Sequence, residues 1–129
     1  MKAKILLIED NAQNRYLVTF ILEKYDYFVL QAEDGEQGIL MANQSRPDLI
    51  LLDIQLPIID GYTVAREIRK IESLAKIPII AITSYAMPGD KVQALEAGCT
   101  GYIEKPINPD TFLAQIEKYL EDIENGAEV

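Results

Sequence analysis

The sequence predicts an α/β fold in which a five-stranded parallel sheet is doubly wound, with helices on both of its faces. Two observations predict this fold. Short runs rich in Ile, Leu and Val alternate with longer segments of helical period, which is typical of parallel strands joined by helices. Three of the runs are continuously apolar, as expected for strands that helices cover on both sides.

The apolar runs give the expected strands in chain order. They are Ala3–Ile8, Tyr27–Ala32, Leu49–Asp53, Ile77–Thr83 and Gly101–Glu104. Because crossovers between parallel strands are right-handed, the simplest doubly wound order is 2-1-3-4-5, a flavodoxin-like arrangement. In such a sheet, ligands bind beyond the carboxyl ends of the strands, where the winding reverses between the first and third strands.

Helices are expected between the runs, and the first of them is Gln13–Lys24. Its residues of helical spacing are Tyr16, Leu17, Phe20, Ile21 and Lys24. A capping box from Asp34 to Gln37 opens the second helix, which continues to about Ser45. The third helix starts at Asp60 or Gly61 and carries Val64, Ile68 and Ile71.

The last two helices have clear end signals. Residues Pro88–Ala97 form the fourth helix, which ends at Gly98, a residue type favoured just after a helix. Asn108 is the expected N-cap of the fifth helix, with Pro109 at its first position. The apolar residues of this helix are Phe112, Ile116, Tyr119 and Leu120. We expect one domain over residues 1–124, a short polar tail at 125–129, and no output domain.

Composition and charge exclude several classes of protein. The 129 residues are 49% apolar and 26% charged, as in ordinary globular proteins. A net charge of −9 disfavours nucleic acid and anionic membranes as partners. The apolar stretch Ile5–Ile8 is too short for a signal peptide or a membrane span. Cys99, the sole cysteine, fits a reducing compartment, so we expect a cytoplasmic protein in which this thiol is buried and unreactive.

Polar residues stand at the strand ends where ligands are expected. Glu9 and Asp10 follow the first strand, Asp53 and Thr83 end the third and fourth, and Lys105 follows the fifth. Singly, each has an ordinary explanation; an acidic pair such as Glu9 and Asp10, for example, often caps a helix. Together, three carboxylates repel one another, and a hard cation such as Mg²⁺ removes that penalty. With Lys105 and the Thr83 hydroxyl beside them, they predict a phosphoryl-accepting site with Asp53 as the nucleophile.

These residues resemble those of the receiver domain of two-component response regulators, from Lys4 to about Ile123. The motifs that carry the resemblance are Glu9-Asp10, Asp53, Leu56-Pro57, Asp60-Gly61, Thr83-Ser84 and Lys105-Pro106. The resemblance implies that Asp53 is the phosphoacceptor. It also implies that Mg²⁺ is held by the carboxylates of Glu9, Asp10 and Asp53 and by the backbone carbonyl of Gln55.

The same resemblance implies a switch and a set of partners. Thr83 corresponds to the switch hydroxyl, Tyr102 to the switch aromatic, and Lys105 to the phosphoryl-binding lysine before a cis proline. The phosphoryl group that Asp53 accepts would come from a histidine kinase or a histidine phosphotransfer domain. A downstream protein would then bind the face formed by the helix 88–97, the strand 101–104 and the last helix. The implied protein is a monomer or weak dimer and no enzyme beyond its own phosphoryl transfer and autodephosphorylation.

The residues at 9–15, 53–57 and 102–107 further resemble the corresponding segments of stand-alone receivers of the DivK type.

Other protein classes fit the sequence less well. A haloacid-dehalogenase phosphatase needs an acidic residue two positions after the nucleophile, where this chain has Gln55. A nucleotide-binding P-loop or dinucleotide site needs glycines at 11–13, and a flavodoxin would have hydroxyls there; neither is found. The alternative that stays open is a receiver-like binding module that works without phosphate.

Overall fold

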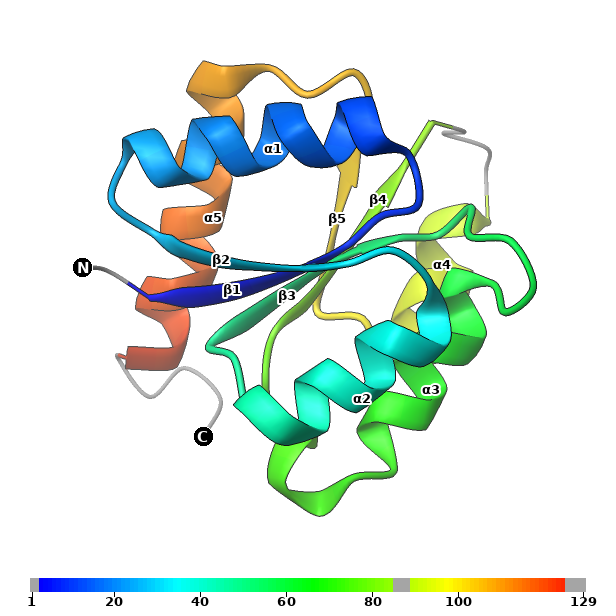
Figure 1. Cartoon of the computed structure of the whole chain (residues 1–129). Coiled ribbons are helices and arrows are strands. Elements are labelled where there is room, and N and C mark those ends of the chain that lie inside the picture. Colours follow the sequence, from blue (N-terminus) through cyan, green and yellow to red (C-terminus); the bar gives the residue numbers. More distant parts are fainter. Residues whose placement is uncertain (1–2, 85–88, 125–129) are drawn as a thin grey trace.

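The computed structural model describes residues 3–84 and 89–124, which form one sheet with helices on both faces (Figure 1). In chain order the elements are β1 (Lys4–Ile8), α1 (Ala12–Lys24), β2 (Phe28–Ala32), α2 (Gly35–Ser45), β3 (Leu49–Asp53), α3 (Gly61–Arg69), the 3₁₀ helix η1 (Glu72–Leu74), β4 (Ile79–Thr83), α4 (Asp90–Glu96), β5 (Gly101–Glu104) and α5 (Pro109–Glu124). All neighbouring strands pair in parallel, in the order β2-β1-β3-β4-β5. The predicted fold class and strand order are confirmed.

The central strands are buried because helices cover both faces of the sheet. Every residue of β3 and β4 is buried. Successive side chains of a strand point to opposite faces, so β1 contributes to two cores. Ile5 and Leu7 belong to the core under α1 and α5, whereas Leu6 and Ile8 belong to the core under α2, α3 and α4. The continuously apolar runs of the sequence therefore reflect a sheet with two apolar faces.

Helix α1 buries a different face from the one that its spacing suggests. Its buried residues are Val18, Thr19, Ile21 and Leu22, whereas Tyr16, Leu17 and Phe20 are exposed. The rings of Tyr16 and Phe20 stack with their centroids 6.2 Å apart. Apolar residues thus lie on two adjacent faces of α1, and spacing alone does not tell which of them meets the sheet.

Side-chain caps start α1, α2 and α3, the helices that follow the carboxyl ends of β1, β2 and β3. Asn11 caps α1, since its side chain accepts a hydrogen bond of 2.9 Å from the N–H of Asn14. The helix-cap explanation for the acidic pair before it is therefore wrong. Asp34 and Asp60 cap α2 and α3 in the same way, as predicted.

Within the described residues, the boundaries differ most from the prediction at the start of β4 and the end of α3. Strand β4 begins at Ile79 rather than Ile77, because Pro78 has no N–H to offer a strand ladder. Helix α3 ends at Arg69, so the predicted helical residue Ile71 lies outside it and precedes η1.

The predicted end signal of the fourth helix and start signal of the fifth lie where the sequence places them. Helix α4 starts at Asp90, and the predicted start at Pro88 lies outside the described residues. Gly98 follows α4 with a φ of 109°, a value that favours glycine. Asn108 caps α5, since its side chain accepts from the N–H of Asp110 at 3.0 Å. None of the helices in the described part of the chain is long and apolar enough to cross a membrane.

The thiol of Cys99 is buried, as predicted, with only 5% of the residue exposed. Burial raises the pKa of this thiol to about 11, although the nearby positive charge of Arg69 opposes the shift. The group is therefore a neutral part of the core at physiological pH.

Candidate functional site

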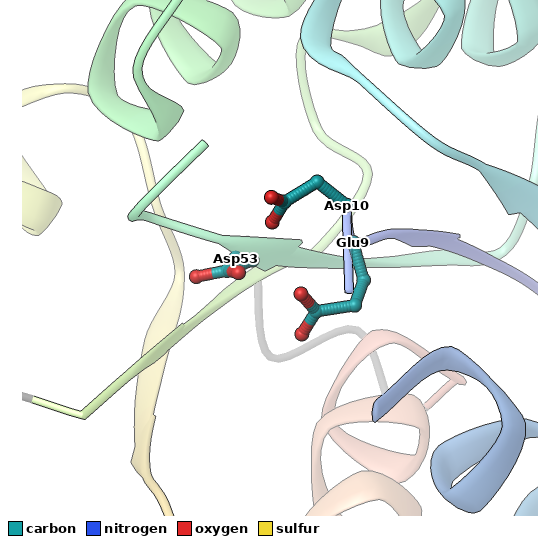
Figure 2. A group of neighbouring side chains, drawn as sticks. All are labelled: Glu9, Asp10 and Asp53. Carbon is teal, nitrogen blue, oxygen red and sulfur yellow. The ribbon is translucent and has the colours of Figure 1, made fainter. Parts of the chain in front are cut away.

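The carboxyl ends of β1 and β3 bring three carboxylates together. Glu9 and Asp10 follow β1, and Asp53 is the last residue of β3. One oxygen from each carboxylate lies within 4.8 Å of those of the other two. Figure 2 shows the three side chains converging on one space. The topology argument from the sequence, which placed these residues at one edge of the sheet, is confirmed.

The three carboxylates differ in their exposure to solvent. Glu9 and Asp53 are each only 3% exposed, whereas Asp10 is exposed. Burial of a carboxylate is unfavourable unless a partner stabilises its charge. The contacts of the two buried groups therefore decide what the site can do.

Each oxygen of the Asp53 carboxylate has a partner that stabilises its negative charge. Its Oδ1 accepts a hydrogen bond of 2.9 Å from the backbone N–H of Gln55. Its Oδ2 lies 3.5 Å from the ammonium of Lys105. These contacts fix the carboxylate at the end of the strand, where it can act as a nucleophile.

Lys105 joins the two buried carboxylates. Its ammonium lies 3.2 Å from Oε1 of Glu9 as well as 3.5 Å from Oδ2 of Asp53. The backbone N–H of Lys105 donates to the carbonyl of Thr83 at 2.8 Å, which ties the end of β5 to the end of β4. The Lys105–Pro106 peptide bond is cis, as the family resemblance implies.

The charges of the site do not balance, and Glu9 responds to the excess. Burial raises the pKa of Glu9 from its usual 4.5 to about 7, and a hydrogen bond with Asp53 and the negative charge of Asp53 add to the shift. The N–H of Asn11, which donates to Oε2 of Glu9 at 3.2 Å, and the charge of Lys105 oppose it. One ammonium thus compensates three carboxylates only in part. Such a site attracts a further cation, and these oxygens suit a divalent one.

Arg15 is a site residue that the sequence did not single out. Its Nη1 donates to the backbone carbonyls of Glu9 and Asp10, at 2.9 and 3.1 Å. Its Nη2 lies 3.7 Å from Oε1 of Glu33 in the loop after β2. The guanidinium therefore fixes the backbone that carries two of the three carboxylates. The signal in the sequence is only its place one turn into α1, which does not reveal these contacts.

Thr83 and Tyr102, the two predicted switch residues, lie on neighbouring strands. Thr83 is the last residue of β4 and is 3% exposed, and Tyr102 is half-buried in β5. Tyr102 pairs in register with Ala81, two residues before Thr83. Burial raises the pKa of the Tyr102 hydroxyl, and the negative charges of Glu104 and Asp90 add to the effect.

Gln55 bridges the loops that follow β3 and β4. Its side-chain oxygen accepts a hydrogen bond of 3.4 Å from the backbone N–H of Ser84. Together with the N–H that it donates to Asp53, this contact places Gln55 beside the acceptor. The predicted role of its backbone carbonyl as a metal ligand stays a prediction.

Comparisons with known proteins agree with this geometry. The family model for the response regulator receiver domain matches residues 5–117. The polar-differentiation response regulator DivK of Brucella anthropi is 37% identical over 122 residues, covering 95% of this chain and 99% of the relative. The receiver domain of sensor histidine kinase PA1611 from Pseudomonas aeruginosa is 36% identical, with a TM-score of 0.87 over 94% of this chain and 99% of that one. In that crystal structure a magnesium ion is coordinated in the active site cleft.

The chemotaxis protein CheY4 of Vibrio cholerae is 29% identical, with a TM-score of 0.88 over 92% of this chain and 98% of that one. The family match extends from the first strand into the last helix of this chain. It therefore includes every strand end that contributes to the site. The chain belongs to the response regulator receiver domain family.

Proposed function

We propose that this protein is a single-domain response regulator of the DivK kind, which accepts a phosphoryl group on Asp53 and signals through changed contacts with other proteins. The observation that carries the proposal is the setting of Asp53. Its carboxylate is buried, lies 3.5 Å from the Lys105 ammonium and shares one space with two further carboxylates. Such a receiver catalyses only its own phosphoryl transfer and its own dephosphorylation, so it is a signalling protein rather than an enzyme.

The phosphoryl group comes from a phosphohistidine of a histidine kinase or a histidine phosphotransfer domain. A carboxylate oxygen of Asp53 attacks the phosphorus, so that a P–O bond forms while the P–N bond to the imidazole breaks. The departing nitrogen takes up a proton and leaves a neutral histidine. Water later attacks the acyl phosphate, which releases inorganic phosphate and a proton and restores the Asp53 carboxylate.

The residues of the site fit a bound Mg²⁺. Glu9, Asp10 and Asp53 offer oxygens that lie close together and carry more negative charge than Lys105 compensates. With the backbone carbonyl of Gln55, they would hold a hard cation that prefers oxygen ligands. When bound, Mg²⁺ supplies positive charge that stabilises the transferring group. The magnesium ion in the Pseudomonas receiver supports this assignment.

Thr83 and Tyr102 form the proposed switch. The hydroxyl of Thr83 turns toward the new phosphoryl oxygens, and Tyr102 then rotates into the space that Thr83 vacates. The face of α4, β5 and α5 changes shape and binds a downstream protein. The protein exists in two states, with the switch residues in their old or new positions. The phosphoryl group shifts the equilibrium between these states only by the difference in free energy of its contacts with each of them.

The proposed partners are proteins throughout. The net charge of −9 disfavours nucleic acid and anionic membranes, and we propose a monomer or weak dimer. A cytoplasmic location fits the sole, buried cysteine. The remaining alternative, a receiver-like binding module that works without phosphate, is not favoured, because the acceptor, both acidic residues and the lysine are all in place.

The test is the intact mass of the chain after incubation with Mg²⁺ and acetyl phosphate. We expect a gain of one phosphoryl group that needs Mg²⁺ and disappears in Asp53→Asn. Asp34→Asn is the matched control, because it makes the same substitution at a capping position where asparagine serves equally well. This control is expected to be phosphorylated like the wild type.

Protein donors complete the test. A panel of autophosphorylated histidine kinases and phosphotransfer domains is incubated with the wild-type chain, and transfer to Asp53 is followed by mass. The absence of any gain, from acetyl phosphate and from the whole panel, would overturn the proposal and leave the phosphate-independent module.

A further inference from the structure

A strained turn lies in the loop between β3 and α3, close to the phosphoacceptor. The N–H of Ile59 donates to the carbonyl of Pro57 at 2.7 Å, which closes a three-residue γ-turn around Ile58. The φ of Ile58 is 68°. A γ-turn with positive φ at its centre is the rarer and more strained of the two kinds. A β-branched residue with positive φ is itself an outlier.

The folded state gains nothing from the side chain at this position. Ile58 is 98% exposed, whereas its apolar loop neighbours Ile54 and Leu56 are each only 7% exposed. Two other non-glycine residues in the described part of the chain have positive φ, Asp26 and Arg46. Both of these are polar, and Arg46 is the C-cap of α2, where such a conformation is common. Ile58 combines backbone strain with an unburied apolar side chain, so folding stability does not explain it.

The loop folds back onto the acceptor, which places Ile58 near it. The N–H of Gly61 donates to the carbonyl of Ile54 at 2.9 Å, directly after Asp53. A Cβ atom at Gly61 would come within 2.7 Å of the backbone oxygen of Asp53. Ile58 is three residues before Gly61, so their Cα atoms lie within about 11 Å of each other. The side chain therefore stands in solvent on the loop that leads from Asp53 to α3, at the carboxyl end of the sheet. Figure 1 shows the course of this loop between β3 and α3.

A protein donor has to come close to this edge. Asp53 is 3% exposed, so a phosphohistidine reaches it only if the surface around that histidine lies against the loops that border the site. On this border Asp10 is exposed and acidic, and an exposed apolar residue offers a partner a contact of a different kind. Strained residues tend to occur where a binding surface needs a side chain in a fixed place.

We propose that Ile58 is a contact residue for the protein that donates the phosphoryl group to Asp53, and that it binds an apolar patch next to the donor's phosphohistidine. This inference rests on the proposed function, since it names a feature of the donor for that same site. The turn holds the isoleucine outward before the donor arrives, so little side-chain freedom is lost on binding.

The test compares a protein donor with a small donor of the same bond type. Phosphoramidate carries a P–N bond, like phosphohistidine, but no protein surface. We expect Ile58→Gly to be labelled by phosphoramidate at the wild-type rate. With a phosphorylated kinase from the panel above as the donor, kcat/KM for phosphoryl transfer to Ile58→Gly is expected to be about tenfold lower than for transfer to the wild type. The loss is expected mainly in KM, because an apolar contact buried between the two proteins is lost. Ile58→Val, which retains most of the apolar surface, is expected to stay within about threefold of the wild type.

The matched control is Arg46→Gly, which removes a positive-φ side chain at the other edge of the sheet. We expect it to leave both donors' rates unchanged. The melting temperature of Ile58→Gly is expected to equal or exceed that of the wild type, since glycine adopts this φ without strain. A lower value would mean that the isoleucine serves the fold, and it would overturn the proposal.

Each remaining outcome separates the contact from the chemistry. Equal transfer from the kinase to Ile58→Gly and wild type would overturn the proposed contact. An equal loss with phosphoramidate would overturn it too, because the residue would then act on Asp53 through the loop. If phosphoramidate labels the wild type but no kinase or phosphotransfer domain does, there is no protein donor to contact and the inference fails alone. If neither phosphoramidate nor acetyl phosphate nor any protein donor labels the wild type, the proposed function fails instead.

Discussion

The interior of the sheet and the carboxyl ends of its central strands are built from opposite kinds of side chain. Between their ends, β1, β3 and β4 bury aliphatic residues on both faces. Of the four polar residues that are buried in the described part of the chain, three stand at these strand ends: Glu9, Asp53 and Thr83. The sheet thus provides stability along its length and concentrates unfavourable buried charge at one edge, where the chemistry is proposed.

The largest expected effect is a loss of stability from the interior. Leu51, fully buried in β3, pairs in register with Leu7 and Ile80. Leu51→Ala is expected to lower the free energy of unfolding by about 3 kcal/mol, because it removes buried methyl groups and leaves a cavity. Urea denaturation measures this change. The Leu51→Ala molecules that are folded should accept a phosphoryl group at the same rate as the wild type.

Leu40→Ala is the matched control for this substitution, since Leu40 is 55% exposed on α2. It is expected to change stability by less than about 0.5 kcal/mol. Similar losses in the two variants would contradict the division between a buried interior and an exposed surface.

The buried carboxyl group of Glu9, which follows the end of β1, should make the free energy of unfolding depend on pH. The pKa of Glu9 is raised to about 7 in the folded protein from a usual 4.5, so the folded state holds this proton more tightly than the unfolded state. The contribution of Glu9 to stability is therefore full below pH 4.5 and is lost as the pH rises through about 7. Without divalent cations, we expect unfolding to become easier by about 2 kcal/mol between pH 5 and 8.

Glu9→Gln removes the titrating group and is expected to flatten this part of the pH profile. Adding Mg²⁺ at pH 8 should raise the free energy of unfolding of the wild-type protein again, because a cation that binds only the folded state stabilises that state. Parallel profiles for wild type and variant, measured by urea denaturation at several pH values, would show that Glu9 is not the source.

Neutralising the predicted phosphoacceptor Asp53 is expected to raise stability, by less than the changes described above. Asp53→Asn removes one of three neighbouring negative charges, while Lys105 keeps its contact with Glu9 at 3.2 Å. At pH 8 without Mg²⁺, we expect the free energy of unfolding to rise by about 1 kcal/mol, since repulsion between like charges is relieved. Asp34→Asn should give no gain, because Asp34 caps α2 outside the acidic group. Loss of stability in Asp53→Asn would mean that the contact with Lys105 outweighs the repulsion.

The contrast also explains what the sequence could predict. Parallel strands that are buried on both faces appear as continuous apolar runs, and the order of the strands then decides which chain positions share an edge. Glu9, Asp53, Thr83 and Lys105 could be brought together in this way although they are far apart in sequence. Their roles follow from the family resemblance and await the experiments above.

Other features depend on information that local patterns do not carry. The apolar residues of α1 continue around the helix, so the exposure of Tyr16 and Phe20 follows only from how α1 lies on the sheet. The contacts of Arg15 with two backbone carbonyls arise once the loop after β1 has folded. The turn at Ile58 lacks the glycine or asparagine that usually signals a positive φ.

The smallest effect is expected at Thr19, the one buried polar residue that lies away from the strand ends in the described part of the chain. Its hydroxyl accepts a hydrogen bond of 3.0 Å from Nε2 of Gln31 on the edge strand β2. Gln31 is exposed, so its amide can bind water instead, and Thr19→Val should change the free energy of unfolding by only about 0.5 kcal/mol. Phosphorylation by acetyl phosphate should be unchanged. A loss as large as that in Leu51→Ala, or slower phosphorylation, would show that buried polarity away from the strand ends matters as much as buried polarity at the site.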